Sequence, residues 1–207
     1  MKIELSVKNA RIVLYKYLGS NQKRLLHSER VAKISVELAK KYHVSQIEAA
    51  IAGLLHDIGK ALQDTNLNYG KSYNVAMLEY CLRNNITMYD FELFDNISAL
   101  HGRISGSFFE KEFGEEEDKD AFNRIKMAIE RHVAGSEEMC LLDKIIFIAD
   151  NVEPDKKDHY LLSSLTNGEK DIDGVIKEII TNKKNRAMRK KLPYNPLLDS
   201  NNEYLER

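Results

Sequence analysis

A histidine followed by an aspartate, His56-Asp57, comes directly after the apolar pair Leu54-Leu55. Adjacent helical residues lie about 100° apart around the axis, so an imidazole nitrogen and a carboxylate oxygen can reach one ion at a helix end. An unpaired carboxylate among apolar neighbours is strongly unfavourable, whereas a coordinated one is not. The pair therefore indicates a metal site, with an ion pair between Asp57 and Lys60 as the simpler alternative.

Other potential ligands stand beside apolar residues elsewhere in the chain. Four of the six histidines fall on predicted helices and are expected to face inward: His27, His56, His101 and His132. Asp150 ends the apolar run 145–149, so its carboxylate is expected near the core, where a positive group must meet it. Asp143 lies seven residues earlier and either shares the site or caps its helix; we favour the cap. His43 and His159 adjoin charged turns and are left outside the site.

Helical periodicity places these residues. Between 21 and 42 the apolar residues Leu26, Val31, Ile34, Leu38 and Ala39 form an amphipathic stripe, with His27 beside it. The sequence Ser45 to Glu48 fits a capping box and predicts a helix that stops near Gly59. Further helices are expected at roughly 7–18, 71–84, 98–113, 120–133, 138–152 and 171–190. No β-alternating run competes with them, so the fold class is all-α.

Composition bounds the remaining possibilities. At 207 residues, with 43% hydrophobic and 30% charged residues, the chain suits one globular domain. Its 31 basic and 32 acidic residues leave a net charge of −1, which offers no global attraction for nucleic acid or an anionic membrane. Any anionic ligand must therefore be held locally. The acidic stretch 115–118 and the seven basic residues of 177–191 are interpreted as solvated surface.

The compartment is inferred from the cysteines and the N-terminus. Cys81 and Cys140 are far apart and lack a Cys-x-x-Cys spacing, which suits a reducing cytoplasm. Residues 1–20 contain no uninterrupted apolar core of the kind that a signal peptide or a membrane span requires. We expect a soluble cytoplasmic protein.

The order of the candidate ligands resembles that of a known superfamily. The series His27, His56-Asp57 and Asp150 is similar to the ligand order of the HD-domain metal phosphohydrolases, and His101 and His132 between them resemble the fuller set of its dinuclear members. The resemblance implies a single-domain helical bundle over 1–207, with a metal core at about 21–155 and a C-terminal helix and tail at about 171–207. One or two ions are possible.

Several short motifs resemble a narrower family, the bacterial YqeK hydrolases. They are Arg24-x-x-His27-Ser28, Ala52-Gly53-Leu54-Leu55-His56-Asp57-Ile58-x-Lys60, Leu100-His101-Gly102 with Gly106, Ala128-Ile129-x-x-His132 with Gly135, and Ile148-Ala149-Asp150-x-x-Glu153-Pro154. This resemblance implies symmetrical hydrolysis of diadenosine tetraphosphate, a dinucleoside polyphosphate, into two ADP. It implies iron as the cofactor, with Mn, Co, Ni or Zn as possible substitutes.

The chain departs from that family's pattern at two places. Val133-Ala134 replaces a pair of threonines after His132, and Asp155-Lys156-Lys157 stands where an arginine is usual. Lys156 or Lys157 can supply the positive charge, but a lysine lacks the bidentate grip of an arginine on phosphate.

The same resemblance implies roles for the site residues. The metal ligands would be His27, His56, Asp57 and Asp150, with Asp57 bridging if two ions bind. The catalytic set would be Asp57, Lys60, His101 and His132, the two histidines acting either as ligands of a second ion or as phosphate contacts. Nucleotide contacts would come from Arg24, Lys60, His101, His132 and Lys156. For Arg24 the alternative is a surface salt bridge.

Three other functions stay open at this level. An HD-type phosphohydrolase can act on another nucleotide, although the Gly-Tyr-Pro signature usual in cyclic dinucleotide enzymes is missing from this sequence. Some di-iron proteins of the same fold are oxygenases. A non-catalytic helical module would use the buried histidines and aspartates as a hydrogen-bonded network without metal. The sequence also leaves a homodimer open.

Overall fold

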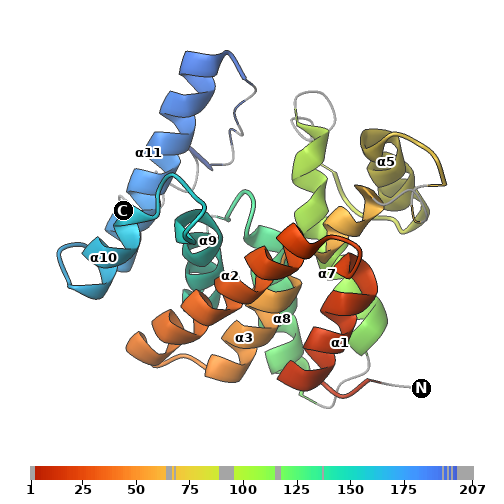
Figure 1. Cartoon of the computed structure of the whole chain (residues 1–207), viewed down its shortest axis with the longest axis horizontal. Helices are drawn as coiled ribbons and strands as arrows, with labels where there is room; N and C mark the ends of the chain where they lie inside the picture. The colour runs from red at the N-terminus through yellow and green to blue at the C-terminus, as the bar shows by residue number, and fades with distance from the viewer. Residues whose placement is uncertain are drawn as a thin grey trace.

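A computed structural model shows how the helices are arranged (Figure 1). The structure describes residues 3–192 apart from 64–66, 68, 89–95, 115–117 and 137, together with 194, 196, 198 and 199. Throughout this part of the chain the regular elements are helices and no strand occurs, which confirms the all-α fold class. The stretch 115–117, interpreted above as solvated surface, lies outside the described residues.

The elements follow one another with short connections. In chain order they are α1 (Val7–Leu18), α2 (Gln22–Lys41), α3 (Gln46–Leu55), the 3-10 helix η1 (Ile58–Gln63), α5 (Tyr73–Arg83), the 3-10 helix η2 (Ile97–Leu100), α7 (His101–Phe113), α8 (Lys119–Arg131), α9 (Leu141–Val152), α10 (Tyr160–Thr166) and α11 (Ile172–Lys190).

The centre of the bundle consists of α2, α3, α8 and α9, which pack on one another (Figure 1). Helix α7 covers α8 and η1, and α1 packs on α3. Helices α10 and α11 lie at one side of the bundle, where α11 packs on α9. The apolar faces of these helices form one buried core, and the site described below lies where the central helices meet.

A glycine permits the close approach of α2 and α3. A Cβ atom on Gly53 would lie 2.6 Å from Cα and 2.9 Å from the backbone nitrogen of Ala32, distances that real side chains do not tolerate. The N-terminus of α3 is fixed as the capping pattern predicts, since Oγ of Ser45 accepts a hydrogen bond from the backbone N–H of Glu48. The two helices therefore meet backbone to backbone, three residues before His56.

Several sequence expectations need correction. Leu26, assigned to the apolar stripe of the second helix, is 48% exposed, because the neighbouring Leu25 occupies the buried position in that turn; the rest of the stripe is buried as expected. Helix α3 ends at Leu55, before Gly59, since the chain tightens into η1 from Ile58 onward. The segment expected as one helix at 98–113 is divided into η2 and α7, and α10 was not predicted.

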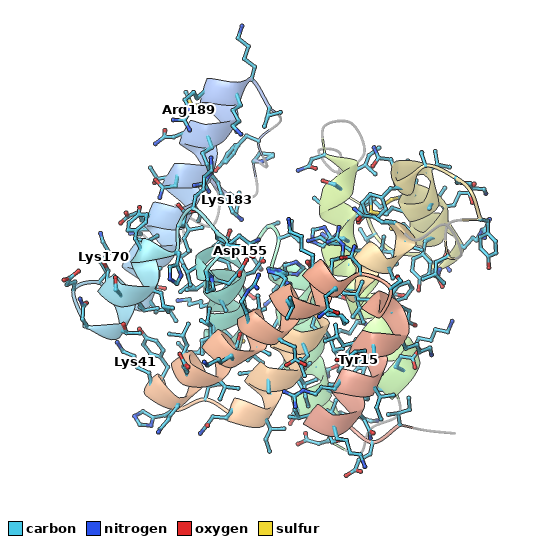
Figure 2. All side chains as sticks on the ribbon, in the orientation of Figure 1. Tyr15, Lys41, Asp155, Lys170, Lys183 and Arg189 are labelled. Atoms are coloured by element: carbon cyan, nitrogen blue, oxygen red, sulfur yellow. The ribbon has the colours of Figure 1, made fainter. Side chains whose placement is uncertain are left out.

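The basic segment 177–191 is partly buried. Nζ of Lys183 lies 4.9 Å from the ring centroid of Phe147 on α9, so this ammonium packs against the core and not in open solvent. The interpretation as a wholly solvated face is therefore wrong for Lys183, while Lys184, Arg189 and Lys190 are exposed. The figure with all side chains shows Arg189 at the outer part of α11, away from the central helices (Figure 2). No described helix is long and apolar enough to cross a bilayer.

Candidate metal centre

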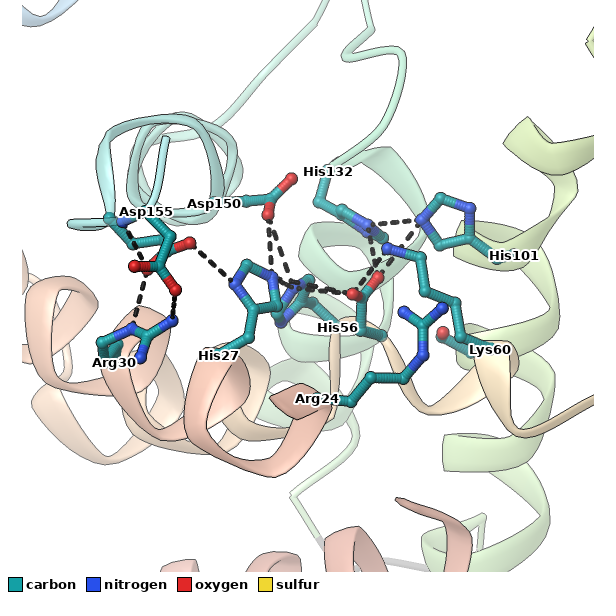
Figure 3. A network of polar contacts seen from close by, with 12 residues as sticks. Arg24, His27, Arg30, His56, Lys60, His101, His132, Asp150 and Asp155 are labelled. Atoms are coloured by element: carbon teal, nitrogen blue, oxygen red, sulfur yellow. Dashed lines mark hydrogen bonds and ion pairs between the residues drawn. The ribbon is translucent and has the colours of Figure 1, made fainter. Parts of the chain in front are cut away.

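The helices bring the predicted residues to one place (Figure 3). His27 comes from the second turn of α2, His56 and Asp57 follow the last turn of α3, and His101 begins α7. His132 caps the C-terminus of α8, and Asp150 lies near the end of α9. Residues that are 123 positions apart in the sequence, His27 and Asp150, are thus in contact.

One group of ligand atoms surrounds Nε2 of His27. This atom lies 3.1 Å from Nε2 of His56, 3.1 Å from Oδ1 of Asp150 and 3.6 Å from Oδ2 of Asp57. Nε2 of His56 lies 3.6 Å from Oδ2 of Asp57 and 3.7 Å from Oδ1 of Asp150. Ligands bound at about 2.0–2.2 Å to one ion are separated by roughly 3.0–3.5 Å, so this group has the dimensions of a coordination shell.

A second group uses the other oxygen of the same carboxylate. Oδ1 of Asp57 lies 3.2 Å from Nε2 of His101 and 3.5 Å from Nε2 of His132, and the two imidazole nitrogens are 3.1 Å apart. Asp57 therefore belongs to both groups, with one oxygen directed to each. Such an arrangement suits a carboxylate that bridges two ions.

The histidines at helix ends are oriented by their own backbone. Nδ1 of His56 donates to the carbonyl of Gly53 at 2.8 Å, Nδ1 of His132 to Ile129 at 2.7 Å, and Nδ1 of His101 to Ser98 at 2.5 Å. The carbonyls of Gly53 and Ile129 lie in the last turns of α3 and α8, where carbonyls lack an intrahelical partner and are available as acceptors. The carbonyl of Ser98 in η2 also accepts the backbone N–H of His101. With the proton on Nδ1, each Nε2 presents a lone pair to the centre.

His27 is held differently, by a residue from another helix. It lies within α2, and its Nδ1 contacts Oε1 of Glu153 at 3.3 Å. Glu153 is buried, and its second oxygen accepts a hydrogen bond from Nε of Arg30 at 2.8 Å. Asp155 contacts the same guanidinium. Glu153 belongs to a motif quoted above, but no role was predicted for it; its position three residues after Asp150 was the available signal.

Electrostatics favour a cation at this centre. Burial lowers the pKa of His56 to about 3, and burial and then Lys60 lower that of His101 to about 4, so both imidazoles are neutral at pH 7. Burial would raise the pKa of Asp57, but the Lys60 ammonium together with His56, His101 and His132 holds that pKa well below its usual value. For Asp150 burial is likewise outweighed, by the contact with His27 and the charge of Lys156 together with His56 and His132.

Two observations show that the residues fit a metal ion. Oδ1 of Asp57 is buried and accepts no hydrogen bond from any described residue. Lone pairs on Nε2 face one another across 3.1 Å in each histidine pair, His27 with His56 and His101 with His132, because every Nδ1 is committed elsewhere. Facing lone pairs beside a buried carboxylate are unfavourable until a cation lies between them.

Cations border the centre on the solvent side. Nζ of Lys60 lies 2.6 Å from Oδ2 of Asp57, and Nζ of Lys156 lies 3.1 Å from Oδ1 of Asp150. Arg24 contacts the amide oxygen of Gln63 rather than a carboxylate. Together with Arg30 these three side chains line a cleft of about 400 Å³ whose wall includes His27 and Asp57. The ion pair considered for Lys60 is therefore present, and its ammonium also faces the cleft.

The residues set apart from the site are elsewhere. Asp143 caps α9, accepting from the backbone N–H of Cys140 at 3.1 Å, and pairs with Arg131 at 2.7 Å, so the preference for a capping role is confirmed. His43, Lys157 and His159 are exposed. Of the two candidate lysines after Pro154, only Lys156 contacts the centre.

The family model that matches this chain is the HD domain, over residues 24–155. The chain belongs to the HD domain family. All six residues of the two ligand groups fall inside this HD domain, so the match and the geometry concern the same part of the molecule. HD domain proteins bind divalent metals, and the His/Asp cluster of this one offers the groups to do so.

Relatives with recorded activities are similar over much of this HD domain protein. A symmetrical bis(5'-nucleosyl)-tetraphosphatase of Staphylococcus aureus is 34% identical over 133 residues, 64% of this chain and 60% of the relative. A protein of the same name from Halalkalibacterium halodurans is 27% identical over 84% of this chain and 83% of its own length. The chain thus matches somewhat less than two thirds of the Staphylococcus protein's length.

A solved structure has the same fold. It is a predicted HD superfamily hydrolase from Clostridium acetobutylicum, described as involved in NAD metabolism, with a TM-score of 0.77 and 23% identity. The alignment covers 100% of this chain and 98% of that one. The single HD-type helical bundle expected from the sequence is thereby confirmed.

Proposed function

We propose that this HD domain protein is a metal-dependent hydrolase that cleaves diadenosine tetraphosphate symmetrically into two ADP. The proposal is carried by one observation: Asp57 directs one oxygen to the imidazoles of His27 and His56 and the other to those of His101 and His132, beside a cleft lined with cations. The names of the Staphylococcus and Halalkalibacterium relatives supply the substrate.

Two ions fit the proposed centre. The first would be held by His27, His56, Asp57 and Asp150, and the second by Asp57, His101 and His132. When bound, such ions lower the pKa of a water molecule and neutralise charge that develops on phosphoryl oxygens. We propose iron as the metal of the native protein, with Mn, Co, Ni or Zn able to replace it, since imidazole and carboxylate ligands suit all of them.

The protein's own side chains would position the phosphates. Arg24 lies one helical turn before His27, and its planar guanidinium suits bidentate contact with a phosphate. Lys60 and Lys156 would exchange their carboxylate partners for phosphate oxygens when the carboxylates bind metal. In this proposal His101 and His132 act on phosphate only through the second ion. Water adds across the central phosphoanhydride bond, and each half of the dinucleotide leaves as ADP.

We also propose a domain organisation, a compartment and a partner for the chain. The family match ends at residue 155, but α11 packs on α9, so we place 1–207 in one domain with its metal core at about 21–155. Cys81 and Cys140 lie far apart in the sequence without a Cys-x-x-Cys spacing, which suits the reducing cytoplasm where we place the protein. The partner is the dinucleotide itself, without nucleic acid or membrane, and a homodimer is compatible with this assignment.

Anaerobic incubation of the iron-loaded protein with diadenosine tetraphosphate tests the proposal, with the products separated by chromatography. We expect ADP as the sole product, and loss of turnover in Asp57→Asn. His43→Ala, which alters an exposed histidine outside the centre, serves as the matched control and should retain wild-type turnover. AMP together with ATP would show asymmetric cleavage and overturn the assignment, as would oxidation of substrate with consumption of dioxygen.

A further inference from the structure

A second cleft adjoins the one that faces the metal centre. Its volume is about 330 Å³, compared with about 400 Å³ for the first, and both lie in the range of roughly 300–1,000 Å³ typical of small-molecule sites. Three residues line both clefts: Asn21, Arg24 and Lys60. Figure 3 shows Arg24 and Lys60 side by side next to the metal ligands, so the shared wall is where the second cleft lies nearest to the metal centre.

The two clefts differ in character away from this shared wall. The first is lined by ionic side chains, including Lys23, Arg30, Asp155 and Lys156. The residues that line only the second cleft are all uncharged: Tyr17, Leu18, Ser20, Ala61 and Gln63. The second cleft therefore begins at two cations and continues into a neutral, partly apolar pocket.

The apolar wall of the second cleft is rigid. The ring of Tyr17 stacks on Phe108 with a centroid separation of 4.5 Å, and its hydroxyl donates to Oε1 of Glu112 at 2.9 Å. Leu18 and Ala61 are each only 2% exposed. Flat, fixed apolar surface with hydrogen-bonding groups at its rim, here Ser20 and Gln63, is the setting that a nucleoside recognises.

Symmetrical cleavage requires binding space on both sides of the reacting phosphates. The bond to be broken lies midway along the tetraphosphate, so equal lengths of substrate must extend from the reacting phosphates in two directions. The structure offers two clefts of similar volume that diverge from Arg24 and Lys60, beside Asp57.

We propose that the second cleft binds one nucleoside half of the substrate, packed on Tyr17, while the other half lies in the first cleft. This inference rests on the proposed function and adds to it the site that recognises the molecule as a dinucleotide. Arg24 and Lys60 then contact the phosphates between the two halves.

Two substrates that differ by one nucleoside test this assignment. Diadenosine tetraphosphate can fill both clefts, whereas adenosine 5'-tetraphosphate carries four phosphates and only one adenosine. We expect kcat/KM of the metal-loaded wild-type protein to be at least about tenfold higher for the dinucleotide, because binding energy from a remote group is used at the reacting centre.

Variants that fill the second cleft should erase that preference. Ser20→Trp, in the turn between α1 and α2, and Gln63→Trp, on η1, introduce bulk from two different elements at exposed positions. Each is expected to bring the ratio of the two kcat/KM values close to one. Lys23→Ala is the matched control, since Lys23 lines only the first cleft and should lower both values alike, leaving the ratio unchanged.

The outcomes separate this inference from the proposed function. If wild-type protein forms ADP from the dinucleotide but the ratio is near one, or if neither tryptophan variant changes it, the second cleft is not a nucleoside site and the proposed function stands. If neither compound is hydrolysed, the proposed function fails and the inference fails with it.

Discussion

The histidines of the metal centre are positioned in two different ways. His56, His101 and His132 lie at helix ends, where each donates Nδ1–H to a backbone carbonyl three residues earlier. His27 lies inside α2, where the carbonyls are used by the helix itself, and its Nδ1 is met by Glu153 from the end of α9. The first three orientations are therefore local properties of the sequence, whereas the fourth depends on tertiary packing and on a charge.

The largest loss of activity is expected from substitution of Asp57, the residue that the two ligand groups share. Asp57→Asn keeps the shape of the side chain but replaces one of its two oxygens with an amide nitrogen, which cannot bind a metal. We expect kcat to fall on the order of 10³-fold, because both ions depend on this carboxylate. The measurement is single-turnover hydrolysis at saturating substrate. Activity within about tenfold of wild type would show that Asp57 does not bridge.

Glu153 provides the sharpest test of the difference between His27 and the other histidines. Glu153→Ala leaves Nδ1 of His27 without its acceptor, and loss of such a partner typically weakens metal affinity about 10–100-fold. Glu153→Gln keeps an acceptor oxygen but loses the charge, so its metal affinity should lie between those of the wild type and Glu153→Ala. Competition with a chelator measures the affinity. If Glu79→Gln, a change of a partly exposed carboxylate paired with Lys71 and Arg83, weakens metal affinity equally, Glu153 has no special role.

Gly53 connects the two kinds of histidine, because its carbonyl orients His56 and its missing side chain lets α2 approach with His27. In Gly53→Ala the added Cβ meets the backbone of Ala32, which cannot move aside alone, so we expect destabilisation of about 1–3 kcal/mol in urea unfolding. Gly106→Ala is the control, since its Cβ meets the flexible side chain of Glu130. Equal stability losses in the two variants would contradict this packing argument.

The smallest effect is expected at the two lysines. Lys60 lies at the bridging carboxylate and lines both clefts, while Lys156 lies at Asp150 and lines only the first. Lys60→Met should lower kcat/KM for diadenosine tetraphosphate by about tenfold through lost phosphate contact, and Lys156→Met by less. A larger loss of kcat/KM in Lys156→Met than in Lys60→Met would contradict the assignment of Lys60 as the more important phosphate contact.

Most helices and the inward-facing histidines could be predicted from the sequence, because they depend on residues close to one another in the chain. Apolar periodicity predicted α1, α2, α8 and α11 nearly to the residue, and the four inward-facing histidines were recognised from their apolar neighbours. The break between α3 and η1 was missed because Gly59 is typical of a helix end, whereas the chain tightens into a 3-10 helix already from Ile58 onward.

The parts that could not be predicted depend on contacts between distant segments. The residues around His27 in the sequence do not indicate that Glu153 is its partner, because the two residues are 126 positions apart. The residues that line only the second cleft, on α1, in the following turn and on η1, likewise belong to none of the quoted motifs. The periodicity of apolar residues predicts which face of a helix is buried. It does not predict which other helix that face contacts, because this depends on tertiary packing.

The most direct test of the central claim is the metal content per chain of anaerobically purified protein, measured by mass spectrometry with protein quantified by amino-acid analysis. The two groups that share Asp57 predict two transition-metal ions per chain in the wild type, one in His101→Ala and none in Asp57→Asn. A wild-type protein without stoichiometric metal, or an Asp57→Asn variant that retains both ions, would contradict the account.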